Sequence, residues 1–418
     1  MTQGVDTAIE SARLAARAGD LASAWAELAP HRGEVAEQLA LAWAWLALWQ
    51  QDPAPPRSLD VFDALADAWP HHPRFVELHV RALTSQIEGR VTHGPVPDDD
   101  PAIRAAAIAR RCLGALDAAD LADPDVGGRL WAAYAGVLRL AGPAHELATE
   151  AAYARALATS PDRPEWLHDR GLFEKHRGRW TEALQLFRRV RDLGGDDAGL
   201  RWNLAIAATA VGEGPAALDA WLALGYDARP GGDGLPVVAD LGKCRVRLWG
   251  ATPEDVWVRS ISPVHGIVLD PTWGRCDADC GDLVLWDGSP IAGEAGSELA
   301  PLFPLLARLR EGGVRKYPFV AVGPGMERLE AAGRGLPDAV WIHRYQGGSP
   351  AGFAGALIVE PESDPAEAVG LFEAVLAELA EGDLDLAIPE LHAAVGDEVR
   401  AAEHRERWPA LERRLVPR

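Results

Sequence analysis

The spacing of hydrophobic positions changes once along the chain, near its middle. From residue 7 to about residue 225, apolar residues recur at intervals of three and four in segments of helical length, separated by Gly, Pro and Asp. After residue 236, short stretches alternate apolar and polar positions instead, as in "KCRVRLWG" at 243–250. The pattern therefore predicts an all-helical first half, and a second half that contains β-strands.

In the second half, the spacing of apolar residues predicts strands first and a mixture of strands and helices afterwards. The stretches "KCRVRLWG", "DVWVRSI", "HGIVLD" and "GDLVLWDG" predict antiparallel strands of one sheet. Beyond residue 297 the pattern predicts, in order, helix "SELAPLFPLLARLREGG", strand "YPFVAVG", helix "MERLEAAGRG", strands "DAVWIHRYQ" and "GALIVEP", and helices from Pro365 onward. We therefore expect an α/β or α+β domain with a mixed sheet.

A stretch rich in Gly and Pro separates the two halves. This stretch, "DARPGGDGLP" at 227–236, has the composition of a linker. The chain has 418 residues, whereas single hydrophobic cores stop growing near ~250 to 300 residues. The sequence therefore predicts a multidomain protein, with a helical repeat domain at 1–226, a linker at 227–236 and an α/β (α+β) domain at 237–418.

The helical half repeats itself when it is shifted by 34 residues. The positions that align without a gap are Gly171 with Ala205, Gly178 with Gly212, Ala183 with Ala217, Phe187 with Trp221, Tyr153 with Phe187, and Ala156 with Val190. Thr149 stands where the repeat expects an alanine. Such self-similarity at a fixed period indicates a stack of identical supersecondary units.

This repeat resembles the tetratricopeptide repeat, a 34-residue helix-turn-helix unit. Small residues lie where its two helices cross, an aromatic residue lies on the second helix, and a helix breaker ends the unit. Residues 164–197 and 198–231 match best, 130–163 matches in its second half, and Gly19 and Ala24 carry the same turn and crossing spacing. The resemblance implies a superhelix whose first helices line a groove that binds a protein or peptide.

Counting along the repeats places aromatic and cationic side chains on the groove face. The groove candidates are Trp131, Tyr134, His168, Leu172, Lys175, His176, Trp202 and Thr209, together with Leu138 and Ile206. Rigid aromatic residues beside a few cationic groups favour an apolar or acidic extended ligand. The alternative is that Trp131 and Trp202 pack between neighbouring repeats.

The composition and net charge of the chain exclude some classes of binding partner. The formal net charge of −21 disfavours binding to nucleic acid and to anionic membranes, and no apolar run approaches the ~20 residues that span a bilayer. Only three basic residues are lysines, which indicates a GC-rich bacterial coding bias.

The polar N-terminus lacks the features of a signal peptide, so we expect a cytoplasmic protein whose four cysteines are thiols or metal ligands.

One segment could carry chemistry. "PTWGRCDADCGD" at 271–282 places Cys276 and Cys280 four positions apart, and His265 together with Asp277, Asp279, Asp282 or His343 could complete a zinc or iron site. The two thiols could instead form a reversible disulfide. The absence of a second cysteine pair and the Gly- and Asp-rich context favour a plain surface turn, so we expect no cofactor.

Two functions follow from these patterns. The favoured one is a non-catalytic cytoplasmic scaffold or adaptor that captures a protein or peptide through its helical repeats. The alternative is an enzyme, such as a metal-dependent one, with its active centre around His265, Cys276, Cys280 and His343. In that case the helical repeats would recruit a polypeptide substrate.

Overall fold

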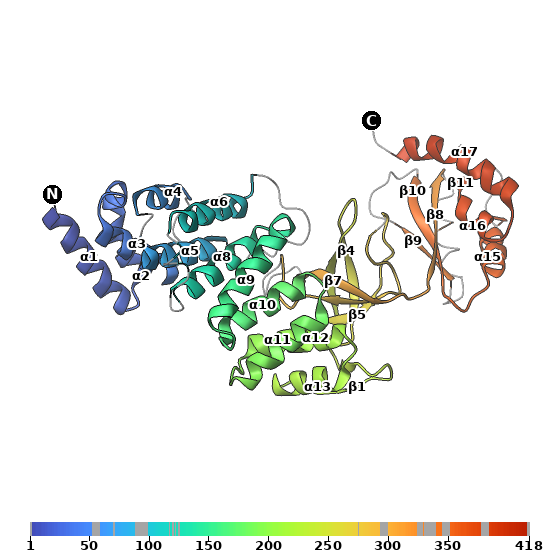
Figure 1. The fold of residues 1–418 in the computed structure, drawn as a ribbon. Helices are drawn as coiled ribbons and strands as arrows, with labels where there is room; N and C mark the ends of the chain where they lie inside the picture. Colours follow the sequence, from blue (N-terminus) through green and yellow to red (C-terminus); the bar gives the residue numbers. More distant parts are fainter. Residues whose placement is uncertain are drawn as a thin grey trace. The chain divides into compact units, whose positions relative to one another are not determined.

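The computed structural model divides into two compact units (Figure 1). Met1–Gly225 is the helical unit and Tyr226–Arg418 is the strand unit. The residues that the structure describes are 2–51, 59–69, 72–87, 99–116, 118, 121, 123, 126–274, 276–292, 300–323, 329, 340–344, 352–377 and 384–415. The prediction of an all-helical first half is confirmed, because every regular element described before residue 226 is a helix.

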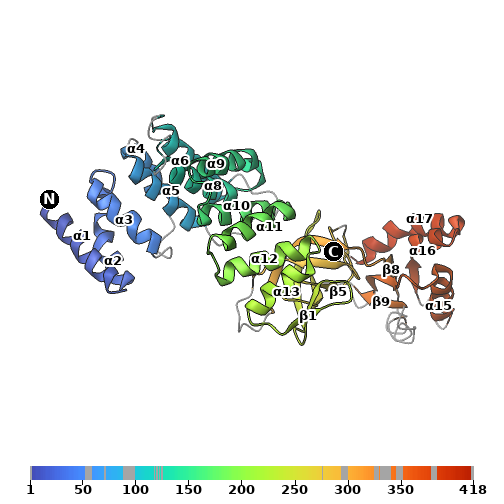
Figure 2. The ribbon, with the colours of Figure 1, turned by 60° about the horizontal axis from the view of Figure 1, so that its bottom comes forward.

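Helices follow one another along the helical unit. Their bounds are α1 (Thr2–Arg17), α2 (Leu21–Leu28), η1 (Ala29–Glu34), α3 (Leu39–Gln51), α4 (Leu59–Ala68), α5 (Pro73–Ile87), α6 (Pro101–Gly114), α8 (Gly127–Leu140), η2 (Pro143–His145), α9 (Glu146–Thr159), α10 (Pro164–His176), α11 (Trp180–Asp192), α12 (Ala198–Ala210) and α13 (Gly214–Ala223). Figure 2 shows α10 to α13 following one another as two helix pairs.

The predicted 34-residue period is confirmed in this unit. The helices α9, α11 and α13 begin at Glu146, Trp180 and Gly214, and α10 and α12 begin at Pro164 and Ala198, so equivalent helices start 34 residues apart. Between the helices of the last two pairs, Gly178 and Gly212 have φ angles of 69° and 77°. Glycine is favoured there because other residues are strained in this left-handed region.

Small residues let the paired helices approach closely. A Cβ atom added to Gly171 on α10 would lie 2.5 Å from Cε1 of Phe187 on α11, a ring that is fully buried. Ala183 and Ala217, the equivalent alanines of α11 and α13, are fully buried as well. Thr149 occupies this position on α9 and is tolerated there because its hydroxyl donates a hydrogen bond of 2.9 Å to the His145 carbonyl.

The first helices of the unit share one core that is rich in tryptophan. Gly19 turns the chain between α1 and α2 with a φ angle of 80°, and Ala24 on α2 is fully buried, as the repeat spacing predicts. The rings of Trp25, Trp45 and Trp49 then meet edge to face, with centroids 5.2 to 5.7 Å apart. These contacts join α2 to α3.

The strand unit consists mostly of strands. Its described helices lie near the end of the chain, and the last strand lies between the first two of them. Their bounds are β1 (Ala228–Pro230), β2 (Pro236–Val238), β3 (Lys243–Leu248), β4 (Glu254–Ser260), β5 (His265–Val268), β6 (Leu283–Trp286), β7 (Leu302–Arg310), β8 (Arg315–Val322), β9 (Val340–Arg344), β10 (Gly352–Val359), α15 (Pro365–Ala377), β11 (Asp385–Ala387), α16 (Pro389–Ala394) and α17 (Glu398–Leu415).

The first strands form a closed barrel, in the order β3-β4-β5-β6-β7. Each strand is antiparallel to the next, as predicted, and β7 closes the barrel by pairing with β3 in parallel. The helix predicted at 297–313 is therefore wrong, since Leu302–Arg310 is the closing strand. Its apolar run suits either state by spacing alone, and pairing with both β6 and β3 decides the outcome.

The predicted linker is also corrected. The strands β1 and β2 form a hairpin that begins inside this segment and ends at Val238, and Ala228 and Leu235 are buried in it. The amide of Val238, the last residue of β2, donates a hydrogen bond of 2.8 Å to the Ile261 carbonyl, so the hairpin joins the barrel. The Gly and Pro residues of this segment supply a tight turn, with Gly234 at a φ angle of 86°.

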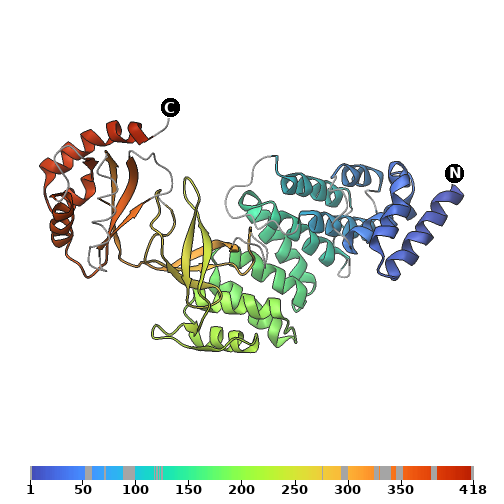
Figure 3. The ribbon, with the colours of Figure 1, turned by 180° about the vertical axis from the view of Figure 1, so that it is seen from behind.

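The remaining strands form a separate antiparallel sheet, in the order β11-β8-β10-β9, which replaces the predicted single mixed sheet (Figure 3). Alternate residues of β8 point to opposite faces. Phe319 packs in one cluster with Ala368 of α15 and Leu391 of α16, while Val320 packs with Leu411 of α17. Helices thus cover both faces. The helix predicted at 326–335 lies outside the described residues, except for Leu329.

Candidate functional site

The predicted groove residues lie on the first helices α8, α10 and α12. The indole of Trp131 on α8 is half-buried, and the guanidinium carbon of Arg155 on α9 lies 4.3 Å from its ring centroid. The Tyr134 ring is tilted against Trp131 with 6.2 Å between the centroids. Trp131 therefore takes part in a cation–π contact within its own helix pair.

Four of the predicted groove residues are buried instead, and two of them are Leu138 on α8 and Ile206 on α12, which are 2% and 1% exposed. Lys175 on α10 is 3% exposed, and its Nζ donates a hydrogen bond of 2.9 Å to Oδ1 of Asn203 on α12. Thr209 on α12 is 1% exposed. These four side chains do not line an open surface, which corrects the prediction for each of them. Lys175 connects one helix pair to the next.

The other predicted groove residues differ in exposure. His176 is exposed at the end of α10, whereas Leu172 and His168 are half-buried. Burial lowers the pKa of His168, whose ring centroid lies 5.6 Å from that of Phe187. Trp202 meets Trp221 of α13 edge to face at 4.8 Å. The two predicted tryptophans thus pack largely inside their own helix pairs.

The residues proposed for a metal site have separate partners. His265 at the start of β5 is fully buried, and its Nδ1 lies 2.6 Å from Oγ of Ser262. Sγ of Cys280 lies 3.3 Å from the Leu269 carbonyl, while Sγ of Cys276 lies 3.7 Å from Oε1 of Glu254. Among the parts of the chain that the structure describes, no three His, Cys, Asp or Glu side chains gather to hold a metal ion.

Burial controls the protonation of these groups. It lowers the pKa of His265 to about 4, and it raises the pKa of Cys276 to about 11 and that of Cys280 to about 12. Burial also lowers the pKa of His343 on β9. Near neutral pH these raised pKa values keep the two free thiols protonated, and a protonated thiol is a poor nucleophile.

Carboxylates hold the cysteine-containing loop in place. Oδ1 of Asp279 accepts hydrogen bonds of 2.9 Å from the Thr272 amide and 2.8 Å from the Cys280 amide. The ammonium group of Lys316 on β8 pairs with Asp279 and donates to the Thr272 carbonyl at 2.6 Å. The aspartate between the two cysteines therefore fastens the loop to the four-stranded sheet.

A cysteine and a histidine that the sequence did not single out meet in the core of the helical unit. Sγ of Cys112 on α6 lies 3.6 Å from Nδ1 of His79 on α5, and both residues are almost fully buried. Burial raises the pKa of Cys112 to about 12 and lowers that of His79 to about 3. The pair is thus neutral near pH 7, and it has no access to a substrate.

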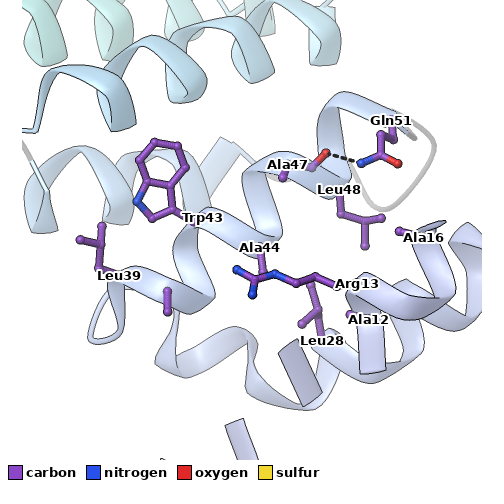
Figure 4. A pocket seen from close by; sticks show the side chains of 11 residues that line it. Ala12, Arg13, Ala16, Leu28, Leu39, Trp43, Ala44, Ala47, Leu48 and Gln51 are labelled. Atoms are coloured by element: carbon purple, nitrogen blue, oxygen red, sulfur yellow. Dashed lines mark hydrogen bonds between the residues drawn. The ribbon is translucent and has the colours of Figure 1, made fainter. Parts of the chain in front are cut away.

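A cleft on the first three helices offers a binding surface (Figure 4). Its volume is about 720 Å³, within the ~300 to 1,000 Å³ that is usual for ligand pockets. Its lining is mostly apolar and consists of Ala12, Arg13, Ala16, Leu28, Leu39, Ala40, Trp43, Ala44, Ala47, Leu48 and Gln51. Arg13 is its single charged residue.

Sequence reasoning did not find this cleft. The available signal was the spacing of Ala40, Ala44 and Ala47 in "LALAWAWLALWQQ", which places three methyl groups on one face of α3. The cleft forms because these side chains are short while Leu39, Trp43 and Leu48 around them are long. Such a cleft depends on the sizes of neighbouring side chains on different helices. The spacing of hydrophobic residues along one helix does not show those sizes.

No helix among the described residues is long and apolar enough to cross a membrane. No protein-family model matches the chain, and no curated protein matches it. Among solved structures, the chain is similar to PilW, a widely conserved type IV pilus biogenesis factor, with 14% identity and a TM-score of 0.40. It is also similar to pilF of Pseudomonas aeruginosa, with 12% identity and a TM-score of 0.37. Each match covers 53% of this chain and 91% of the other.

Proposed function

We propose that this chain is a non-catalytic scaffold or adaptor that binds a protein or peptide through its helical unit. The observation that carries the proposal is the stack of helix pairs with a 34-residue period between Glu146 and Ala223. Stacked helix pairs present extended surfaces on which a polypeptide can contact several repeats at once. The apolar cleft on α1 to α3 adds an accessible surface that suits such a partner.

The chemistry of the strand unit supports the scaffold over the enzyme. Of the four residues named for an active centre, His265, Cys276, Cys280 and His343, the first and third are buried, and burial raises the pKa of both thiols, which disfavours a thiolate nucleophile. A cytoplasmic location belongs to the same proposal. Its basis is the cysteine content, since four cysteines in 418 residues are far fewer than in a disulfide-rich secreted protein.

Site-specific photo-crosslinking tests the proposal. A photoreactive amino acid replaces exposed His176 at the end of α10, and in a matched variant it replaces exposed Arg191 on α11. We expect the full chain with the probe at residue 176 to crosslink to a polypeptide in its native cells, because first helices line the binding surface. The probe at residue 191, on a second helix, is expected to give several-fold less product. Mass spectrometry of the adducts is the measurement.

Two results would count against the scaffold. One is the absence of any polypeptide adduct at either position. The other is equal crosslinking at both positions, which would indicate random collision and not a binding face.

A further inference from the structure

The cleft on α1 to α3 has the form of a groove along a helix. Ala40, Ala44 and Ala47 lie at i, i+4 and i+7 on α3, and Ala12 and Ala16 lie at i and i+4 on α1. From Leu39 to Gln51 the α3 wall is about 18 Å long, or roughly three helical turns. Because alanine is the shortest side chain with a Cβ, another helix can approach this surface closely.

One wall of the groove is a rigid aromatic residue. The Trp43 ring is held by edge-to-face contacts with Phe75 on α5, at 5.5 Å between centroids, and with His72, at 5.9 Å. Figure 4 shows its indole beside Leu39, at one end of the groove. A tryptophan that is already fixed loses little conformational entropy when a ligand packs against it, so it suits an anchor contact.

One positively charged side chain, Arg13, lies at the rim of the groove. Arg13 is exposed and, within the described ranges of the chain, makes no ion pair, although many other arginines do. Arg104, for example, pairs with Asp60 and Asp63. No carboxylate lines the groove. A guanidinium at the edge of an apolar groove selects a ligand that places a carboxylate there.

We propose that this groove binds an amphipathic, acidic α-helix of a partner protein. The helix carries large apolar side chains at i, i+4 and i+7, which fill the space above the alanines. It also carries a Glu or Asp that pairs with Arg13. The spacing of the apolar side chains follows from the matching spacing on α3. This inference rests on the proposed scaffold function and specifies the chemistry of its partner.

Charge exchange on both sides of the groove tests the proposal. The probes are two synthetic fluorescent helices of about four turns, each with leucines at i, i+4 and i+7; one has glutamates beside the leucines and the other has lysines. Binding to the full chain is measured by fluorescence anisotropy. We expect the acidic helix to bind the unaltered chain, and Arg13→Glu to weaken this binding about tenfold or more.

The same variant is expected to bind the lysine-containing helix more tightly than the unaltered chain does. Arg32→Glu makes the identical charge change on exposed η1, outside the groove lining, and is expected to alter affinity less than about twofold. Ala47→Trp places a bulky ring in the groove from an exposed position, so we expect it to abolish binding while the helical content is retained.

The proposal is overturned if neither helix binds, or if Arg13→Glu and Ala47→Trp leave the affinity of the acidic helix unchanged. In either case, polypeptide crosslinking at residue 176 would still support the scaffold function, with its binding surface elsewhere on the helical unit. Loss of both the crosslink and the helix binding would remove the scaffold function as well.

Discussion

Replacing Ala183 with tryptophan is expected to lower the free energy of unfolding of the helical unit by about 3 kcal/mol, the upper end of the range for overpacked cores. Ala183 is 0% exposed and lies one turn before Phe187, whose ring already leaves no room for a Cβ at Gly171. An indole cannot be accommodated unless α10 and α11 separate. Ala217→Trp should behave alike, because Ala217 occupies the equivalent position of the next pair. Urea unfolding followed by far-ultraviolet circular dichroism is the measurement.

Ala154→Trp is the matched control for this experiment. Ala154 lies on the exposed face of α9, so the same substitution there is expected to change stability by no more than about 0.5 kcal/mol. If Ala183→Trp and Ala217→Trp unfold at the same urea concentration as this control, the 34-residue register is wrong.

Trp286→Ala is expected to lower the free energy of unfolding of the strand unit by about 3 to 5 kcal/mol, as is usual for the loss of a large buried aromatic residue. Trp286 ends β6, is 1% exposed, and packs in one cluster with Val246, Val258 and Leu305 from β3, β4 and β7. Its removal leaves a cavity at the centre of the barrel. Near-ultraviolet circular dichroism during denaturation follows the loss of this packing.

Trp273→Ala removes a tryptophan from the same unit without opening its core. Trp273 is 45% exposed, so we expect a much smaller effect, near that of ordinary surface substitutions. Equal destabilisation by Trp286→Ala and Trp273→Ala would contradict the closed barrel with Trp286 at its centre.

The helix pairs could be predicted from the sequence because their determinants are local and repeated. A small residue at 171, 183, 205 and 217, and a glycine at 178 and 212, recur with one period, and each does the same job in each pair. Even the exception at Thr149 fits, because its hydroxyl finds a partner within its own helix. Contacts between residues that are close in the sequence produce a repeating pattern, which can be recognised in one sequence without any other.

The barrel could be predicted only in part, because its closure depends on distant pairing. The strand β3 alternates apolar and polar residues, and β6 is a short apolar run bounded by glycines, so both could be recognised. The longer segment around β7, "SELAPLFPLLARLREGG", has the length and apolar spacing of a helix, although Pro304 lies inside it. Only its pairing with β3, more than fifty residues earlier, fixes it as a strand.

The surface of the helical unit was harder to predict than its core. Counting along the repeats placed Lys175 and Thr209 on the groove face, but both are buried, and Lys175 instead donates to Asn203 of the next pair. Spacing within one helix identifies a face, whereas exposure of that face depends on the neighbouring helices. The cleft beside Arg13 shows the same limit, since it needs α1 and α3 together.

Amide hydrogen exchange of the full chain, with and without the partner that crosslinks at residue 176, tests the central claim most directly. The scaffold function predicts slower exchange on the first helices of the repeats, α8, α10 and α12, or along the groove of α1 and α3. Exchange in the strand unit should change little. Protection confined to Tyr226–Arg418, with the helical unit unchanged, would contradict binding through the helical repeats.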